Sequence, residues 1–210
     1  VVIVAGAAGI SSGIGVMKGI IDSAPDISKI DVTPTGYSTT VLAANGEETA
    51  TLVGQGANRQ YVTIDEIPLD LQHAFVAIED ERFYDHNGID LHGIGRAFIS
   101  GLSKGRFSEG ASTITQQLIK NNVLTSWTSE TSFVEKLQRK IQEQYLALEL
   151  EKQVNDKDWI LENYMNSVNL GANTLGVQAA SKKYFNKDVS ELTLSEASVI
   201  AAVSYTHLRA

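Results

Sequence analysis

Residues 110–121 read GASTITQQLIKN, and the rest of the chain is interpreted outward from this stretch. Ser112 is of a type that caps a helix beginning just after it. In that helix Thr113, Gln117 and Lys120 recur at i, i+4 and i+7, forming one polar stripe beside an apolar face. A polar stripe is most often a solvated face. Its hydroxyl, amide and ammonium groups also suit sugar hydroxyls and phosphate oxygens, so it is a candidate binding surface.

A second polar stretch, AIEDERFYDHNGID at residues 77–90, follows an apolar helical pattern. Glu79 and Asp80 stand where that pattern ends. A carboxylate at the end of a buried helix loses part of its hydration, which makes it a better general base near neutral pH. The alternative is a group of acids that forms a solvated helix end. His86 and His92 lie apart without a third ligand nearby, so the pattern does not favour a metal site.

The third stretch, EKLQRKIQEQYLALELE at residues 135–151, predicts a long helix. Lys140 and Glu143 share one face of it, and Arg139 precedes Glu143 by one helical turn. A structural ion pair is one interpretation of this spacing. The other is a second catalytic carboxylate beside cations that neutralise an anionic leaving group. The apolar residues that we expect to face the core are Leu137, Ile141 and Leu148.

Composition excludes several function classes. The 210 residues include no Cys, which rules out thiolate catalysis and zinc held by sulfur. The formal net charge of −8 disfavours a nucleic-acid partner, because nucleic-acid-binding domains usually carry a basic excess.

The first residues, VVIVAGAAGISSGIG, fit either a dinucleotide-binding loop or a membrane helix of small residues. No Tyr is followed four residues later by a Lys, as the matching dehydrogenases require. Residues 1–22 carry a single basic residue, Lys18, so we favour a membrane anchor over a nucleotide loop, with a cleaved signal sequence as the remaining alternative.

The chain divides into four parts. Residues 1–22 are the expected transmembrane anchor, 23–62 a linker with a hairpin that turns at Asn45-Gly46, 63–203 a mainly α-helical domain, and 204–210 an atypical tail. Capping boxes mark three expected helix starts: Thr63 with Glu66, Ser132 with Glu135, and Thr193 with Glu196.

Taken together, these stretches resemble the peptidoglycan glycosyltransferase (transglycosylase) domain of class A penicillin-binding proteins, glycosyltransferase family 51. The family's first motif matches Glu79, Asp80, Phe83, His86 and Gly88. Its Gly-x-Ser-Thr-x-Thr-Gln-Gln-Leu-x-Lys-Asn motif matches residues 110–121 at every fixed position, and its Arg-Lys-x-x-Glu motif matches Arg139, Lys140 and Glu143. Two further motifs resemble residues 160–171 and 176–202.

The resemblance implies a lysozyme-like α fold and a single-pass protein with its catalytic domain on the outer face of the bacterial cytoplasmic membrane. It also implies polymerisation of lipid II by inverting transfer, with release of polyprenyl pyrophosphate. Glu79 would be the general base, and Glu143 would position the donor or a divalent cation such as Mg2+, although no cofactor is required with certainty. The other implied substrate-binding residues are Asp80, Phe83, His86, Ser112, Thr113, Gln117, Lys120, Asn121, Arg139 and Lys140.

The resemblance also implies partners: lipid II, the growing glycan strand, the membrane and other cell-wall synthesis proteins. The segment RAFISGLSKGRF at residues 96–107 mixes apolar and basic residues and is a candidate contact with lipid headgroups. No Ser-x-x-Lys or Lys-Thr-Gly motif occurs, so we expect a chain without transpeptidase function, either a monofunctional polymerase or a fragment. Two alternatives remain: a lysozyme-like hydrolase, which shares paired acids but needs no diphosphate site, and an inactive anchored scaffold.

Overall fold

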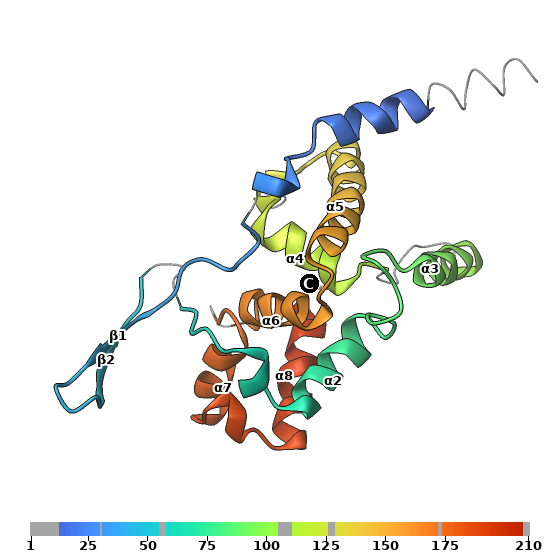
Figure 1. Cartoon of the computed structure of the whole chain (residues 1–210). Helices are drawn as coiled ribbons and strands as arrows, with labels where there is room; N and C mark the ends of the chain where they lie inside the picture. Colours follow the sequence, from blue (N-terminus) through green and yellow to red (C-terminus); the bar gives the residue numbers. More distant parts are fainter. Residues whose placement is uncertain are drawn as a thin grey trace, which may run out of the picture.

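The computed structural model is mainly helical and carries one β-hairpin (Figure 1). It describes residues 13–29, 31–54, 58–104, 111–125, 129–171 and 174–207. After a helix over residues 13–22, the elements are η1 (Ile27–Lys29), β1 (Thr39–Leu42), β2 (Glu48–Leu52), η2 (Ile64–Glu66), α2 (Leu69–Glu79), α3 (Leu91–Lys104), α4 (Ile114–Asn122), α5 (Phe133–Val154), α6 (Lys157–Ser167), α7 (Val177–Phe185), η4 (Val189–Glu191) and α8 (Leu194–His207).

Three pairings of helices organise the body. Helix α2 packs against α8, and α4 packs against both α5 and α6. Phe75 of α2 and Tyr164 of α6 are fully buried and meet edge to face, with ring centroids 6.1 Å apart. Figure 1 shows α6 in the middle of the body, the hairpin projecting on one side and α3 on the other. The three site stretches of the sequence thus converge from the end of α2, the start of α4 and the middle of α5.

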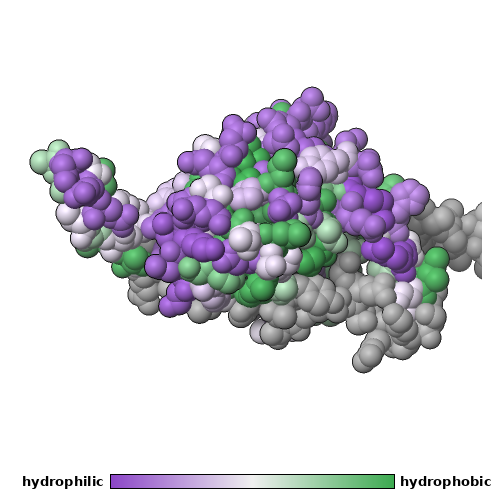
Figure 2. Space-filling model, turned by 90° about the horizontal axis from the view of Figure 1, so that it is seen from below, coloured by the Kyte–Doolittle hydropathy of each residue, from purple (hydrophilic) through white to green (hydrophobic). Residues whose placement is uncertain are grey.

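The hairpin prediction is confirmed. Strands β1 and β2 pair antiparallel around the turn at residues 44–46, and Gly46 has φ +85°, a value that glycine adopts easily. A register shift between Val41 and Leu42 marks an irregularity next to the turn. The strands are exposed along almost their whole length, and the hairpin stands off the body in Figure 1 and in the hydropathy view of Figure 2.

The N-terminal prediction is described only in part. Residues 1–12 of the expected anchor lie outside the described residues, and residues 13–22 form a mostly exposed helix. Within the described part of the chain, none of the helices combines the length and the apolar character needed to cross a bilayer.

The expected core face of α5 is wrong. Leu137 is 48% exposed and Leu148 is 42% exposed, and Ile141 is only half-buried. The buried face consists instead of Glu143, Leu146, Ala147, Leu150 and Glu151. Apolar periodicity misplaced this face because two carboxylates lie on it: Glu143 pairs with Arg139 and Lys140 of the same helix, and Glu151 pairs with Lys157 of α6.

Helix starts follow the predicted capping residues with one correction. Glu135 accepts from the Ser132 backbone while the Ser132 hydroxyl accepts from the Glu135 amide, and Thr193 and Glu196 make the equivalent pair. Thr63 and Glu66 pair in the same way, but at the start of the short helix η2. The cap of α4 is Thr113, whose side chain accepts from the Gln116 amide, rather than Ser112.

Candidate active site

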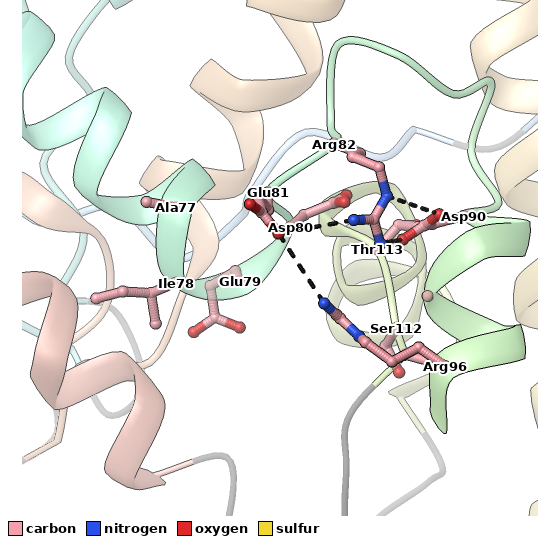
Figure 3. Close-up of a pocket in the computed structure, with 12 residues that line it drawn as sticks. Ala77, Ile78, Glu79, Asp80, Glu81, Arg82, Asp90, Arg96, Ser112 and Thr113 are labelled. Carbon is pink, nitrogen blue, oxygen red and sulfur yellow. Dashed lines mark hydrogen bonds and ion pairs between the residues drawn. The ribbon is translucent and has the colours of Figure 1, made fainter. Parts of the chain in front are cut away.

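A cleft of about 230 Å3 opens where the end of α2, the start of α3 and the segment before α4 meet (Figure 3). Glu79 and Asp80 line it from α2, Arg96 lines it from α3, and Ser112 lines it from the segment that leads into α4. Its wall is therefore polar and carries both signs of charge.

Glu79 is the last residue of α2 and is held by two neutral donors. Its Oε2 accepts from Gln117 Nε2 at 3.0 Å, and its Oε1 accepts from Ser204 Oγ at 2.8 Å. Figure 3 shows its carboxylate pointing away from the ion pair of Arg82 with Asp90. The side chain is half-buried, so it is oriented by hydrogen bonds and still reaches the cleft.

Tyr164 sets the orientation of the Gln117 amide. The Tyr164 hydroxyl donates to Gln117 Oε1 at 3.3 Å, which leaves the amide NH2 to face Glu79. Complete burial raises the pKa of Tyr164 well above its usual value, and the negative charge of Glu79 raises this pKa further. Tyr164 therefore stays protonated and remains a donor.

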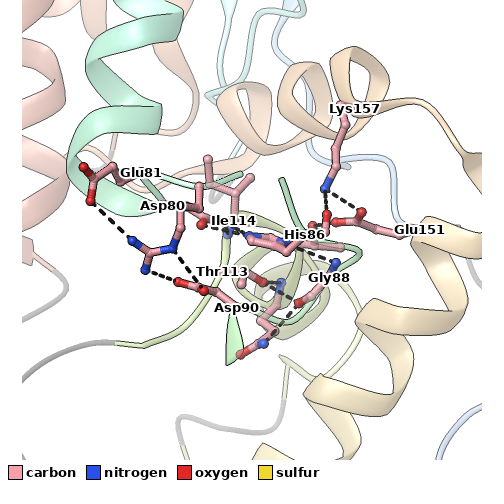
Figure 4. Close-up of polar contacts among 12 residues, drawn as sticks. Asp80, Glu81, His86, Gly88, Asp90, Thr113, Ile114, Glu151 and Lys157 are labelled. Atoms are coloured by element: carbon pink, nitrogen blue, oxygen red, sulfur yellow. Dashed lines mark hydrogen bonds and ion pairs between the residues drawn. The ribbon is translucent and has the colours of Figure 1, made fainter. Parts of the chain in front are cut away.

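Asp80, unlike Glu79, is enclosed. Its side chain accepts from the Ile114 amide at 3.0 Å and from His86 Nε2 at 2.9 and 3.0 Å, and only 6% of the residue is exposed (Figure 4). His86 Nδ1 accepts from the Gly88 amide at 3.2 Å, which places the ring proton on Nε2. Asp80 thus supplies a negative charge at the start of α4 and ties it to the loop after α2.

Gly88 brings that loop close to α5. Its φ is +89°, and a Cβ there would lie 2.6 Å from the Ala147 carbonyl oxygen. Its own carbonyl accepts from Thr113 Oγ1 at 2.8 Å and from Gln116 Nε2 at 3.1 Å.

A cationic group stands on the α5 side. Lys140 Nζ donates to Ser112 Oγ at 2.8 Å, to Gln116 Oε1 at 3.0 Å and to Glu143 Oε2 at 2.9 Å. Glu143 is only 2% exposed, and its other oxygen accepts from Arg139. The carboxylate therefore faces a cation at each oxygen.

Two more predicted residues extend this region along α4. Lys120 is half-buried, and burial lowers the pKa of its ammonium group. The charge of Glu143 acts on Lys120 in the opposite direction. Asn121 follows it, half-buried near the end of the helix. The polar stripe of α4 is consequently not a solvated face: Thr113 is 1% and Gln117 is 7% exposed.

Comparison with known proteins identifies the family. A transglycosylase family model matches residues 45–206. The chain belongs to the transglycosylase family. Its sequence is 44% identical over 166 residues to penicillin-binding protein 1F of Bacillus subtilis, covering 79% of this chain and 22% of that protein. It is 49% identical over 152 residues to penicillin-binding protein 1A of Clostridium botulinum strain Langeland, covering 70% of this chain and 17% of that protein.

A third relative, penicillin-binding protein 1A/1B of Bacillus subtilis, is 38% identical over 185 residues, covering 88% of this chain and 19% of that protein. The chain thus spans about a fifth of the length of these curated relatives. The resemblance drawn from the motifs is confirmed: this is a transglycosylase domain of penicillin-binding proteins.

In the transglycosylase domain the two acids that the sequence predicts to be catalytic, Glu79 and Glu143, are connected through hydrogen-bonded residues but do not line the same cleft. Of the residues described, Glu79 lines the cleft and Glu143 does not. Ser112 connects them, because it lines the cleft and also binds Lys140, the partner of Glu143. Phe83 is fully buried beneath the loop, so it supports the cleft without lining it.

Several residues at this site were missed by the sequence analysis. Lys157 Nζ donates to the His86 carbonyl at 2.6 Å, pairs with Glu151 at 2.6 Å and lies 4.5 Å from the centroid of the Phe83 ring (Figure 4). Ser204, which we had placed in the atypical tail, lies on α8 and binds Glu79. Contacts over such sequence separations leave no local signal in the chain.

Among the described residues, no group of three or more His, Cys, Asp or Glu side chains is arranged to hold a metal ion. Glu143 does not fit the predicted role of cation ligand, because both of its oxygens already accept from cationic donors.

Proposed function

We propose that this domain polymerises lipid II into glycan strands by inverting transfer. Glu79 would remove the proton from the 4-hydroxyl of the acceptor GlcNAc, and that oxygen would attack the anomeric carbon of the donor MurNAc. The bond from that carbon to the diphosphate then breaks, the proton stays on Glu79, and polyprenyl pyrophosphate leaves. The observation that carries the proposal is the placement of Glu79 in one cleft with Ser112, which is bonded to Lys140.

The leaving group needs positive charge, since two phosphate groups depart as an anion. Lys140 can supply it because its side chain is 35% exposed and its ammonium group donates to the cleft residue Ser112. Arg139 would add a second charge. Glu143, which is buried against both cations, would act by positioning them rather than by touching substrate.

We assign the rest of substrate binding to α4 and to the segment before it. Ser112, Gln117, Lys120 and Asn121 would contact the donor, and a lysozyme-like arrangement of helices would enclose both sugars. Because lipid II is held in a membrane, the domain would work at the outer face of the bacterial cytoplasmic membrane, next to other cell-wall synthesis proteins.

The test is incubation of the purified chain with labelled lipid II, followed by size separation of the products. Glycan longer than the substrate supports the proposal. Shorter sugars released from preformed glycan would identify a lysozyme-like hydrolase instead. If neither product forms, with the protein folded and lipid II bound, the domain is an inactive scaffold. The cationic group on α5 favours transfer, because hydrolysis of a glycan releases no diphosphate.

A further inference from the structure

Arg139 is held between two carboxylates in this structure. Its Nε donates to both oxygens of Glu130, at 2.8 and 2.9 Å, and its Nη1 donates to Glu143. The side chains of Arg139, Glu130 and Glu143 are 19%, 11% and 2% exposed. Glu130 belongs to none of the sequence motifs and comes from the segment that precedes α5.

These contacts limit what Arg139 can bind. A guanidinium group recognises a phosphate best through two parallel N–H bonds on one edge. One such edge includes Nε, which Glu130 engages, and the other includes Nη1, which Glu143 engages. A phosphate that binds Arg139 through a full edge must therefore displace one of the two carboxylates.

Glu130 is the one that can leave. Glu143 lies on the buried face of α5 and is also bonded to Lys140. Glu130 lies outside regular helix; the hydrogen bonds described for its carboxylate come from Arg139, and its charge also acts on Lys120. A hollow of about 280 Å3 lies beside it, lined among others by Glu130, Arg139, Gln138 and Gln142. This hollow leaves open space beside the Glu130 carboxylate.

We propose that Glu130 is an internal competitor for the diphosphate at Arg139. In the unliganded enzyme its carboxylate occupies the anion position on the guanidinium, and a diphosphate group takes that position when it binds. The return of Glu130 to Arg139 then favours release of the diphosphate product. This inference rests on the proposed function, in which Arg139 neutralises the leaving group.

The test is Glu130→Gln in the whole chain, with inorganic pyrophosphate as the probe in an EDTA-containing buffer. Isothermal titration calorimetry should show the Kd for pyrophosphate falling about tenfold, because the competing anion is gone and the binding-competent fraction rises. Glu149→Gln removes one negative charge from α5 away from Arg139 and is the matched control, with an unchanged Kd. Adding Arg139→Gln to Glu130→Gln should cancel the gain. In turnover, Glu130→Gln should lower the KM for lipid II and strengthen inhibition by pyrophosphate.

An unchanged Kd in Glu130→Gln, together with a lower melting temperature, would overturn the inference and make the pair a purely structural one. If Glu130→Gln does not fold, Glu130→Asp shortens the side chain by one methylene and should give a smaller gain in the same direction; no gain there would equally overturn it. Lipid II polymerisation by the parent chain is measured separately. A parent that does not polymerise, beside a tenfold gain in Glu130→Gln, would overturn only the proposed function.

Discussion

At Glu79 a carboxylate is oriented by two neutral donors and left open to a cleft. Gln117 and Ser204 hold one oxygen each, at 3.0 and 2.8 Å. This arrangement orients the group toward the space that a sugar hydroxyl would enter, as a general base requires. Asp80, one residue later, is buried and paired with His86. The two adjacent acids thus differ in role: at the end of α2 the Glu79 side chain is directed toward the cleft, and the Asp80 side chain is directed toward His86.

Replacing Glu79 by Gln tests the base assignment. The amide keeps the size of the side chain but accepts no proton, so kcat for lipid II polymerisation should fall about 100- to 10,000-fold. Size separation of labelled glycan measures this loss. The melting temperature of Glu79→Gln should stay close to that of the parent, which shows that the fold is kept. Full polymerisation by Glu79→Gln would remove the assignment, whereas Glu149→Gln should keep the parent rate.

Asp80 is predicted to act through structure. Asp80→Asn removes the charge that faces the start of α4 and weakens the hydrogen bond to His86, at a residue that is only 6% exposed. The free energy of unfolding in urea should therefore fall by about 2 kcal/mol. Asp70→Asn, at an exposed position in the first turn of α2, is the control and should cost only a few tenths of that. Equal losses in the two variants would contradict the buried role.

At the scale of the elements, the polar contacts of α4 join the two halves of the site. Gln116 donates to the Gly88 carbonyl in the loop after α2 and accepts from Lys140 on α5. The buried Gln116 amide therefore bridges the loop and α5, beside the bonds of Thr113 to Gly88 and of Lys140 to Ser112. A displacement of the loop would be passed to Lys140 through this side chain.

Two glycines with opposite surroundings test the packing of these elements. Gly88 has φ +89° and no room for a Cβ beside the Ala147 carbonyl, so Gly88→Ala should destabilise the domain by about 2 to 4 kcal/mol. Gly95 lies inside α3 with nothing within 4 Å of an added Cβ. Gly95→Ala should stabilise the domain by about 0.5 to 1 kcal/mol, because alanine favours the helix. Urea unfolding measures both; a stable Gly88→Ala would contradict the close approach of the loop to α5.

Features were predictable from the sequence where the residues that determine them lie close together in the chain. The hairpin at Asn45-Gly46, the cap at Ser132 and the pair of Arg139 with Glu143 were predictable because each is set within a few residues. The buried face of α5 was not, because Glu151 is buried only through Lys157 and Thr115, which lie on other helices. Glu130 was missed for the same reason: its bond to Arg139 crosses nine residues and follows no repeat.

At the scale of the whole molecule, the segment that follows the hairpin, residues 61–64, is fastened to α6 by hydrogen bonds; we call these bonds the clamp. Glu162 of α6 accepts from the Ile64 amide at 2.6 Å and from the Tyr61 hydroxyl. Asn166, also on α6, accepts from the Val62 amide at 3.0 Å and donates to the Val62 carbonyl at 2.8 Å. Beyond this clamp the strands are exposed. The two strands thus contribute no residue to the core cluster, which is formed by the helices and by flanking residues such as Val32 and Val62.

Acid stability follows from the carboxylates that these contacts engage. The bond from Arg82 holds the pKa of Asp90 at about 2, and the bond from Lys187, with those from Thr193, holds the pKa of Glu196 at about 2. Their ordinary values are 3.8 and 4.5, so both groups bind protons more weakly when the chain is folded. They stabilise the fold above the ordinary values, and this stabilisation is lost as the pH falls through the folded values.

We therefore expect the free energy of unfolding to fall as the pH is lowered from about 4.5 to about 2. Below pH 2 these two groups should make the free energy of unfolding depend less steeply on pH. Asp90→Asn should be less stable than the parent at neutral pH, because Arg82 loses its charged partner, and should lose less stability on acidification. Urea unfolding at a series of pH values measures both slopes. Parallel curves for Asp90→Asn and the parent would show that the Arg82 pair, which closes one wall of the cleft, contributes no acid-sensitive stability.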